Sequence, residues 1–182
     1  MSEPEKLFIH TCCAPCLVAP YHHLRNEGIQ MGIFWYNLNI HPYMEYKLRL
    51  LSLQDFAERE GFEIIMRDEY GLLEFLKNAE DETPGRCRFC YDSRLDLTAK
   101  TAVELGYDAF TSTLLYSKFQ NHELLVEVAH AKAEKYGIPF YYRDWRKLWS
   151  EGVTLSKIEN MHRQKYCGCI YSERDRYLGK KK

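Results

Sequence analysis

Three of the seven cysteines in this 182-residue chain fall within the stretch HTCCAPC, residues 10–16. The other four form two close pairs, Cys87/Cys90 in CRFC and Cys167/Cys169 in CGC. Thiolates at such spacings bind zinc, hold iron–sulfur clusters or exchange electrons through a disulfide. These three kinds of site are therefore open interpretations, and a satisfactory one must account for all seven cysteines.

A redox site of the thioredoxin kind would use only Cys13 and Cys16. A C-x-x-C pair at a helix N-terminus has a lowered thiol pKa, because the helix dipole favours the thiolate. A structural zinc site would instead combine these two cysteines with Cys87 and Cys90, which places four thiolates in a tetrahedron. The redox interpretation leaves five cysteines unexplained. The zinc interpretation separates its two pairs by about 70 residues, far more than a compact zinc knuckle does.

An iron–sulfur cluster needs four thiolates and leaves three cysteines over. The CGC pair suits a redox dithiol, because the single glycine lets the backbone fold tightly enough for two thiols to meet. A strained, exposed disulfide of this kind passes electrons by thiol exchange. A cluster together with Cys167/Cys169 indicates an electron-transfer enzyme. Spacing alone does not separate iron from zinc, so a zinc-stapled, non-catalytic RNA-binding module stays the alternative.

The composition is typical of a globular domain, with 46% hydrophobic and 28% charged residues. The start MSEPEKLFIH lacks the basic and apolar regions of a signal peptide, and no apolar run reaches the ~18 residues of a membrane span. We therefore expect a cytoplasmic protein without a membrane partner. Because structural disulfides are disfavoured in that compartment, its cysteine clusters more often bind metal or do redox work.

Charge is distributed unevenly along the chain. The net charge is −1, but residues 160–182 carry +5 and also contain the CGC pair. We predict that this basic end contacts the phosphates of a nucleic acid, although its last three lysines could also be a solubilising tail. Proteins read RNA loops by stacking bases on aromatic rings. The candidate tyrosines are Tyr43, Tyr46, Tyr166, Tyr171 and Tyr177.

Apolar strands alternate with helical patterns along the chain. We expect strands at 6–11, 31–37, 62–67, 107–113 and 139–142, and helices at 17–28, 43–60, 71–78, 87–105 and 122–136, with short helices at 145–149 and 154–163. This alternation predicts an α/β fold, a doubly wound parallel sheet of about five strands with helices on both faces. We expect one domain, residues 1–182, in which the core spans 1–143 and the segment 144–182 is a helical, basic extension over the active site. In such folds ligands bind at the carboxyl ends of the strands, where HTCCAPC lies.

The residues also carry a resemblance. HTCCAPC after the first strand resembles the H-x-C-C-A-P-C signature of the QueH family, the epoxyqueuosine reductases. The CRFC pair at a helix opening, FTSTLLYS at 110–117 and the late CGC are similar to further features of that family. The resemblance extends from residue 6 to about residue 178. One departure is SKFQ at 117–120, which lacks the proline expected after the serine and leaves the local turn geometry open.

The resemblance implies a HUP-type Rossmann-like fold, a 4Fe–4S cluster and the last step of tRNA queuosine synthesis. In that step the epoxide of epoxyqueuosine in the anticodon loop of a tRNA is reduced by two electrons to give queuosine. Carried over to this sequence, the cluster ligands are Cys12, Cys13, Cys87 and Cys90, and Cys167/Cys169 is the redox-active pair. An external electron donor is implied as a further partner.

Removal of the epoxide oxygen needs two electrons and two protons and releases water. Our hypothesis is that a Lewis-acidic iron binds the epoxide oxygen. Cys16 is a candidate ligand for an additional iron, and the alternative is a packed free thiol. Four residues near cysteines in the sequence are candidate proton donors: His10, Asp92, Tyr91 and His162. The alternatives are that His10 is a core residue and that Asp92 caps or pairs on its helix.

Overall fold

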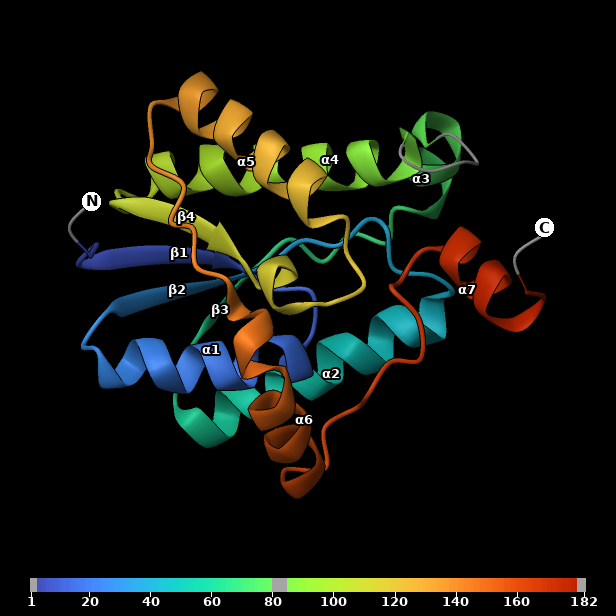
Figure 1. Ribbon diagram of the computed structural model, residues 1–182, viewed down its shortest axis with the longest axis horizontal. Helices are drawn as coiled ribbons and strands as arrows, with labels where there is room; N and C mark the ends of the chain where they lie inside the picture. Colours follow the sequence, from blue (N-terminus) through green and yellow to red (C-terminus); the bar gives the residue numbers. More distant parts are fainter. Residues whose placement is uncertain (1–2, 80–84, 180–182) are drawn as a thin grey trace.

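The computed structural model describes residues 3–79 and 85–179, so the basic tail at 180–182 lies outside the described residues. The elements follow one another from blue to red in Figure 1. They are β1 (Lys6–His10), α1 (Ala14–Asn26), β2 (Gln30–Trp35), α2 (Tyr43–Glu60), β3 (Ile64–Met66), α3 (Leu72–Asn78), α4 (Gly85–Glu104), β4 (Ala109–Ser112), the 3-10 turn η1 (Thr113–Tyr116), α5 (His122–Tyr136), the 3-10 turn η2 (Trp145–Leu148), α6 (Trp149–Ile158) and α7 (Ile170–Tyr177).

The strands form one parallel sheet in the order β3-β2-β1-β4. The side chains of β1 beyond Lys6 are buried, as expected for a central strand that is covered on both faces. In Figure 1, α4 and α5 lie on one side of this sheet, and α1, α2 and α6 lie on the other. The predicted α/β architecture with a parallel sheet and helices is therefore confirmed.

The prediction of about five strands is wrong, because the sheet of the described residues has four. The expected fifth strand, 139–142, makes a single bridge, in which Phe140 pairs with Phe110 of β4. Pro139 has no N–H to donate, and the chain turns into η2 soon after the bridge. One bridge is too short a pairing to make a strand.

Two predicted helices agree with the structure at both ends, because glycine and capping residues mark helix ends in the sequence. The predicted helix at 43–60 is α2, and it ends at Gly61, whose φ of +73° is the left-handed conformation that glycine adopts without strain. The predicted helix at 122–136 is α5, which the Asn121 side chain caps by accepting a hydrogen bond from Leu124 N. None of the described helices combines the length and hydrophobicity that crossing a bilayer requires.

The order of the strands creates a switch point beside β1. The chain proceeds from β1 to β2 and β3 on one side, and β4 then pairs with the other side of β1. The loops after β1 and β4 therefore diverge at the carboxyl edge of the sheet, where ligands bind in folds of this kind. Cys12 N donates to Thr113 Oγ1 at 3.2 Å across this gap. In Figure 1 this edge of the sheet faces α7.

Candidate active site and metal centre

A compact group of thiols follows β1 at the switch point. The Sγ atoms of Cys12, Cys13 and Cys16 all lie within 4.8 Å of one another, and all three residues are buried. Cys13 is the N-cap residue of α1, and Pro15 occupies the first turn, where its missing N–H leaves no hydrogen bond unmade. This tight turn from strand to helix directs three sulfur atoms to one centre. Sulfur donors are the ligands of zinc and iron–sulfur sites.

The three thiols differ in acidity. Hydrogen bonds from Cys13 and Cys16, with a further one from Thr113, lower the pKa of Cys12 well below its usual value. Burial raises the pKa of Cys13, and hydrogen bonding to its two neighbours raises the pKa of Cys16. The group therefore favours one thiolate, on Cys12, held by two protonated neighbours. A metal would displace the remaining protons, because its cysteine ligands must be thiolates.

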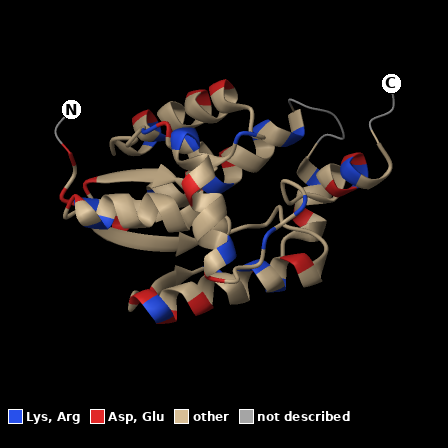
Figure 2. Cartoon of the chain, turned by 60° about the horizontal axis from the view of Figure 1, so that its bottom comes forward, with Lys and Arg blue, Asp and Glu red and all other residues tan. Residues whose placement is uncertain are grey.

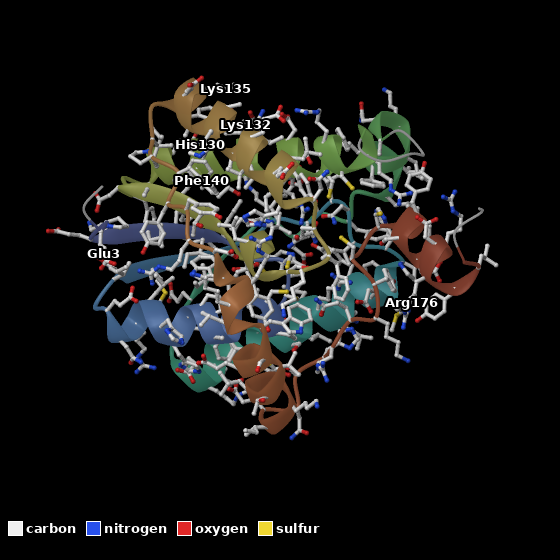
Figure 3. All side chains as sticks on the ribbon, viewed as in Figure 1. Glu3, His130, Lys132, Lys135, Phe140 and Arg176 are labelled. Atoms are coloured by element: carbon white, nitrogen blue, oxygen red, sulfur yellow. The ribbon has the colours of Figure 1, made fainter. Side chains whose placement is uncertain are left out.

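The other four cysteines gather between α4 and the C-terminal segment, residues 159–179. Burial raises the pKa of Cys90, and the nearby thiols of Cys167, Cys169 and Cys87 raise it further. All seven cysteines of the chain are free thiols. In Figure 3 most of the yellow sulfur atoms lie beyond the carboxyl ends of the strands, on the side of α7. The fold thus brings cysteines from both ends of the chain to one region.

Two glutamine side chains donate hydrogen bonds to these sulfur atoms. Gln164 Nε2 lies 3.0 Å from Cys13 Sγ and 3.7 Å from Cys16 Sγ, and Gln120 Nε2 lies 3.2 Å from Cys167 Sγ. Within the described residues the buried Gln164 Oε1 has no hydrogen-bond partner. The hydrogen bonds that the Gln164 amide donates to sulfur therefore determine its orientation. Such donors are typical of residues that support metal ligands.

Arg49 ties the C-terminal segment to α2. Its side chain is 1% exposed, and its Nε donates to Glu45 Oε1 at 2.7 Å. Nη1 donates to the carbonyl of Cys167 at 3.0 Å and Nη2 to the carbonyl of Tyr166 at 3.2 Å. One buried guanidinium therefore fixes the backbone that carries the CGC pair.

Gly168 lies between the two cysteines of that pair in a conformation that favours glycine, with φ at +150°. A Cβ there would lie 3.3 Å from Arg49 Nη1 and 3.4 Å from Asn39 Nδ2, so the backbone approaches both side chains closely. The Gly168 carbonyl accepts a hydrogen bond from His41 N at 2.8 Å. The loop after β2 therefore positions Cys167 and Cys169.

His41 makes two further contacts with the segment. Its carbonyl accepts a hydrogen bond from Tyr166 Oη at 2.5 Å, and its Nδ1 accepts one from Ile170 N at 3.3 Å. The ring Nε2 donates to the Leu38 carbonyl at 3.0 Å, which fixes the neutral tautomer. Burial lowers the pKa of His41 to about 4.

Acidification is expected to destabilise the protein through His41. Its pKa of about 4 lies below the 6.5 of an unperturbed histidine. The unfolded state therefore binds the proton first, so the stabilisation is complete above pH 6.5 and is lost as the pH falls towards 4. The loss amounts to about 2–3 kcal/mol. Urea unfolding at several pH values should show a steeper loss for the wild type than for His41→Phe, and equal slopes would contradict this origin.

Both ring nitrogens of His10 are engaged. Nε2 donates to the Tyr36 carbonyl at 3.1 Å, so Nδ1 is the acceptor for the Ser112 hydroxyl at 2.8 Å. Burial, followed by the charge of Arg94, lowers the pKa of His10 to about 3. At neutral pH the ring is uncharged and its one N–H is committed to a carbonyl, which favours the alternative of a core residue. Its role as a proton donor stays an untested prediction.

The other candidate proton donors have protein partners. Asp92 forms an ion pair with Lys132 of α5 at 2.7 Å, which agrees with the alternative of a structural pair; Lys132 is labelled in Figure 3. Tyr91 Oη donates to Gln120 Oε1 at 2.7 Å, and His162 Nε2 lies 3.0 Å from Glu45 Oε2. Proton transfer by Asp92 likewise stays a prediction.

The five tyrosines proposed for RNA contact differ in exposure, and Tyr166 and Tyr171 are half-buried. Tyr46 is buried and donates to Asp68 at 2.7 Å, so it belongs to the core and is unavailable to a base. Tyr43 and Tyr177 are more than half exposed. Lys and Arg residues recur along the segment that leads to α7 and on α7 itself (Figure 2). The exposed tyrosines therefore remain candidates beside a basic stretch.

Sequence patterns do not predict the polar residues that support the thiols, among them Arg49, Arg94, Gln120 and Gln164. The positions of the two arginines in the sequence do indicate a special role. Arg49 interrupts the apolar face of a helix between Tyr46 and Leu53, and Arg94 follows Cys90 by one helical turn. A charged residue on a face that must be buried indicates an unusual partner.

The donor set fits a metal–thiolate centre. Six of the seven cysteines are buried or half-buried. Amide and guanidinium N–H groups donate to five of the seven sulfurs, those of Cys13, Cys16, Cys90, Cys167 and Cys169. Such N–H···S contacts accompany iron–sulfur ligands. The structure brings Cys12, Cys13 and Cys16 together as one group and the remaining four cysteines as a second. The ligand set carried over from the resemblance takes two cysteines from each group.

Comparison with known proteins shows the relatives of this chain. The sequence model of the family "Epoxyqueuosine reductase QueH" matches residues 7–175. A protein of that name from Dehalococcoides mccartyi is 40% identical over 172 residues, which cover 94% of each chain. Another from Thermotoga maritima is 34% identical, covering 91% of this chain and 89% of the relative. One from Histophilus somni is 36% identical, covering 94% of this chain and 73% of the relative.

These matches include every cysteine of the site, from the group after β1 to the CGC pair. They also span the sheet and the C-terminal segment that surround the thiols. The chain therefore belongs to the epoxyqueuosine reductase QueH family.

Proposed function

We propose that this protein is an epoxyqueuosine reductase, an oxidoreductase that removes the epoxide oxygen of epoxyqueuosine in tRNA to give queuosine. The observation that carries the proposal is the group of three thiols at the switch point, together with four more thiols between α4 and the C-terminal segment, in a chain of this family. The reaction consumes two electrons and two protons and releases water. A tRNA substrate places it in the cytoplasm, with an external electron donor.

The proposed cofactor is a 4Fe–4S cluster on Cys12, Cys13, Cys87 and Cys90. Such a cluster supplies electrons one at a time, so each turnover needs a second carrier or a second reduction. The CGC pair is the proposed second carrier. Cys16 is then left over beside two cluster ligands, as a free thiol or as a ligand of an additional iron.

The C-terminal part of the chain is proposed to enclose the cysteines. We propose a Rossmann-like fold of the HUP type, in which the segment 144–182 closes over the cysteines as part of a single domain. The contacts of Gln164 with Cys13 and of Arg49 with the Cys167 carbonyl support this arrangement, because both hold the segment against the thiols. Five of the seven cysteines are buried, which keeps water from their sulfur atoms and strengthens the electrostatic interactions there.

We propose that an RNA base stacks on the exposed ring of Phe119. This ring is 80% exposed and meets Trp149 edge-on, with 5.6 Å between centroids. Lys118 Nζ lies 5.7 Å from the centroid of the same Trp149 ring. The loop also carries Gln120, which contacts Cys167, so a base bound here lies beside the thiols. Exposed aromatics beside cations are typical of single-stranded RNA sites.

Substitution of Phe119 is expected to weaken RNA binding. Loss of one stacked base costs about 1–3 kcal/mol, so Phe119→Ser should bind an anticodon stem–loop roughly 5- to 150-fold more weakly. Leu73→Ser is the control, because Leu73 is 81% exposed but belongs to α3 and has no aromatic ring on which a base could stack. Fluorescence anisotropy measures both, and equal affinities of the two variants would contradict the stacking site.

The activity itself is tested with protein purified and reconstituted without oxygen. The expected protein is brown, and with a reductant it converts epoxyqueuosine in tRNA to queuosine, seen by mass spectrometry as the loss of one oxygen from the nucleoside. A colourless protein that holds one zinc and leaves the nucleoside unchanged would refute the reductase and favour the zinc-stapled RNA-binding module.

A further inference from the structure

Arg94 is a buried arginine on α4, one helical turn after Cys90. Its residue is 1% exposed, and its Nη2 lies 2.9 Å from Cys90 Sγ. Its Nε donates to the Cys90 carbonyl, also at 2.9 Å, and Thr98 Oγ1 donates to the Arg94 carbonyl at 2.6 Å. The guanidinium is therefore held against a sulfur atom in a fixed orientation.

The charge of Arg94 has no carboxylate partner within residues 3–79 and 85–179. The comparable buried arginine, Arg49, pairs with Glu45 at 2.7 Å. Arginine stays protonated inside proteins, and a buried charge without a counter-charge is strongly unfavourable. The folded protein must therefore supply negative charge near Arg94 in another form.

Sulfur atoms are the remaining source of that charge. The strongest electrostatic neighbours of Arg94 are Cys90, Cys167 and Cys12, which come from α4, the C-terminal segment and the loop after β1. The two other titratable groups beside it are uncharged. Burial raises the pKa of Tyr91, and burial together with the charge of Arg94 lowers that of His10. The guanidinium thus faces the place where thiolates from three segments meet.

We propose that Arg94 sets the reduction potential of the metal centre by balancing the negative charge of its sulfur ligands. The inference rests on the thiolate-bound cluster of the proposed function. A fixed positive charge favours the state that holds one more electron, and an N–H···S hydrogen bond acts in the same direction. Arg94 is a positioning residue, which acts through Cys90.

The test is an anaerobic redox titration of the reconstituted protein, followed by visible absorption. Arg94→Met removes the charge and the donors but keeps an unbranched side chain. At a fixed solution potential, the ratio of reduced to oxidised centre in Arg94→Met should be about tenfold lower than in the wild type. For a one-electron centre this corresponds to a midpoint potential about 59 mV more negative. Arg94→Lys keeps the charge and should shift less. Lys100→Met, which removes an exposed charge from the same helix, should keep the wild-type midpoint.

Iron per chain and far-UV circular dichroism are measured for every variant. An unchanged midpoint in Arg94→Met, or an equal shift in Arg94→Lys, would overturn the proposal. If Arg94→Met takes up no iron, Arg94→Gln should titrate at a more negative potential than Arg94→Lys, and equal midpoints would overturn it. If all Arg94 variants fold but none binds iron, Arg94 is needed for assembly of the centre, and the proposal that it sets the potential is overturned. A wild-type protein without iron would refute the proposed cofactor.

Discussion

Replacement of Cys12, Cys13, Cys87 or Cys90 by serine is expected to abolish cluster binding and to leave below about 1% of the reductase activity. A serine hydroxyl is a hard, protonated donor at neutral pH and does not replace a thiolate on iron. Loss of one ligand removes a quarter of the proposed set, and even changes to residues that only hydrogen-bond to metal ligands lower metal affinity or activity about 10- to 100-fold. Iron per chain and single-turnover conversion of tRNA measure the two losses separately.

Cys16→Ser is the matched control for this series. Its sulfur lies within 4.8 Å of Cys12 and Cys13 and is as deeply buried, so the substitution perturbs the same place. With the proposed ligand set, this variant keeps the visible spectrum of the cluster. A partial loss of iron would identify Cys16 as a ligand of an additional metal. If Cys16→Ser loses all its iron while Cys87→Ser keeps its iron, the ligands are instead those of the group after β1, and the proposed ligand set is wrong.

Arg49→Met is expected to cost about 3–5 kcal/mol of unfolding free energy, the usual effect of breaking a buried charge pair. The substitution leaves Glu45 without its guanidinium, although His162 still lies 3.0 Å from its other oxygen. It also removes two hydrogen bonds to the carbonyls of Tyr166 and Cys167. The C-terminal segment should therefore loosen, and activity should fall with it. Urea unfolding of the metal-free protein and limited proteolysis measure these effects.

Arg59→Met provides the comparison on the same helix. Arg59 pairs with Glu159 at 3.1 Å and so also joins α2 to the C-terminal segment, but its side chain is 44% exposed. Exposed pairs contribute about 0–1 kcal/mol, so this variant should unfold almost as the wild type does. Similar losses in the two variants would show that Arg49 acts only as one more surface contact and would contradict its anchoring role.

Local patterns were enough to predict much of the fold and the place of the site. Apolar residues at helical spacing between Pro42 and Gly61 predict α2, because such a face must pack on the sheet. The cysteines after a short apolar strand likewise predict a site at the carboxyl edge, since the parallel topology leaves loops there. Both inferences use only neighbours within a few residues.

What remained hidden depends on distant parts of the chain. The segment 139–142 reads as a strand, yet whether it pairs is decided by Phe110 and by the turn into η2. The sequence does not reveal the partners of Arg49 and Arg94, because only the folded protein places a carbonyl of residue 167 or a cluster of thiols beside them. Sequence spacing also cannot tell which cysteines share a centre, since four of the seven meet across α4 and the C-terminal segment.

The contact between Gln164 and Cys13 joins residues 151 positions apart. A ribosome releases Cys13 long before it has made Gln164 or the CGC pair, so the complete environment of the first thiols does not exist while the chain is being synthesised. Closure of so long a loop is slow compared with local helix formation. The thiols after β1 therefore stay uncovered until the last segment of the chain has been made and docked. The proposed metal centre is therefore enclosed only after the last segment has docked, and a chain that ends before residue 164 would lack the amide that contacts Cys13.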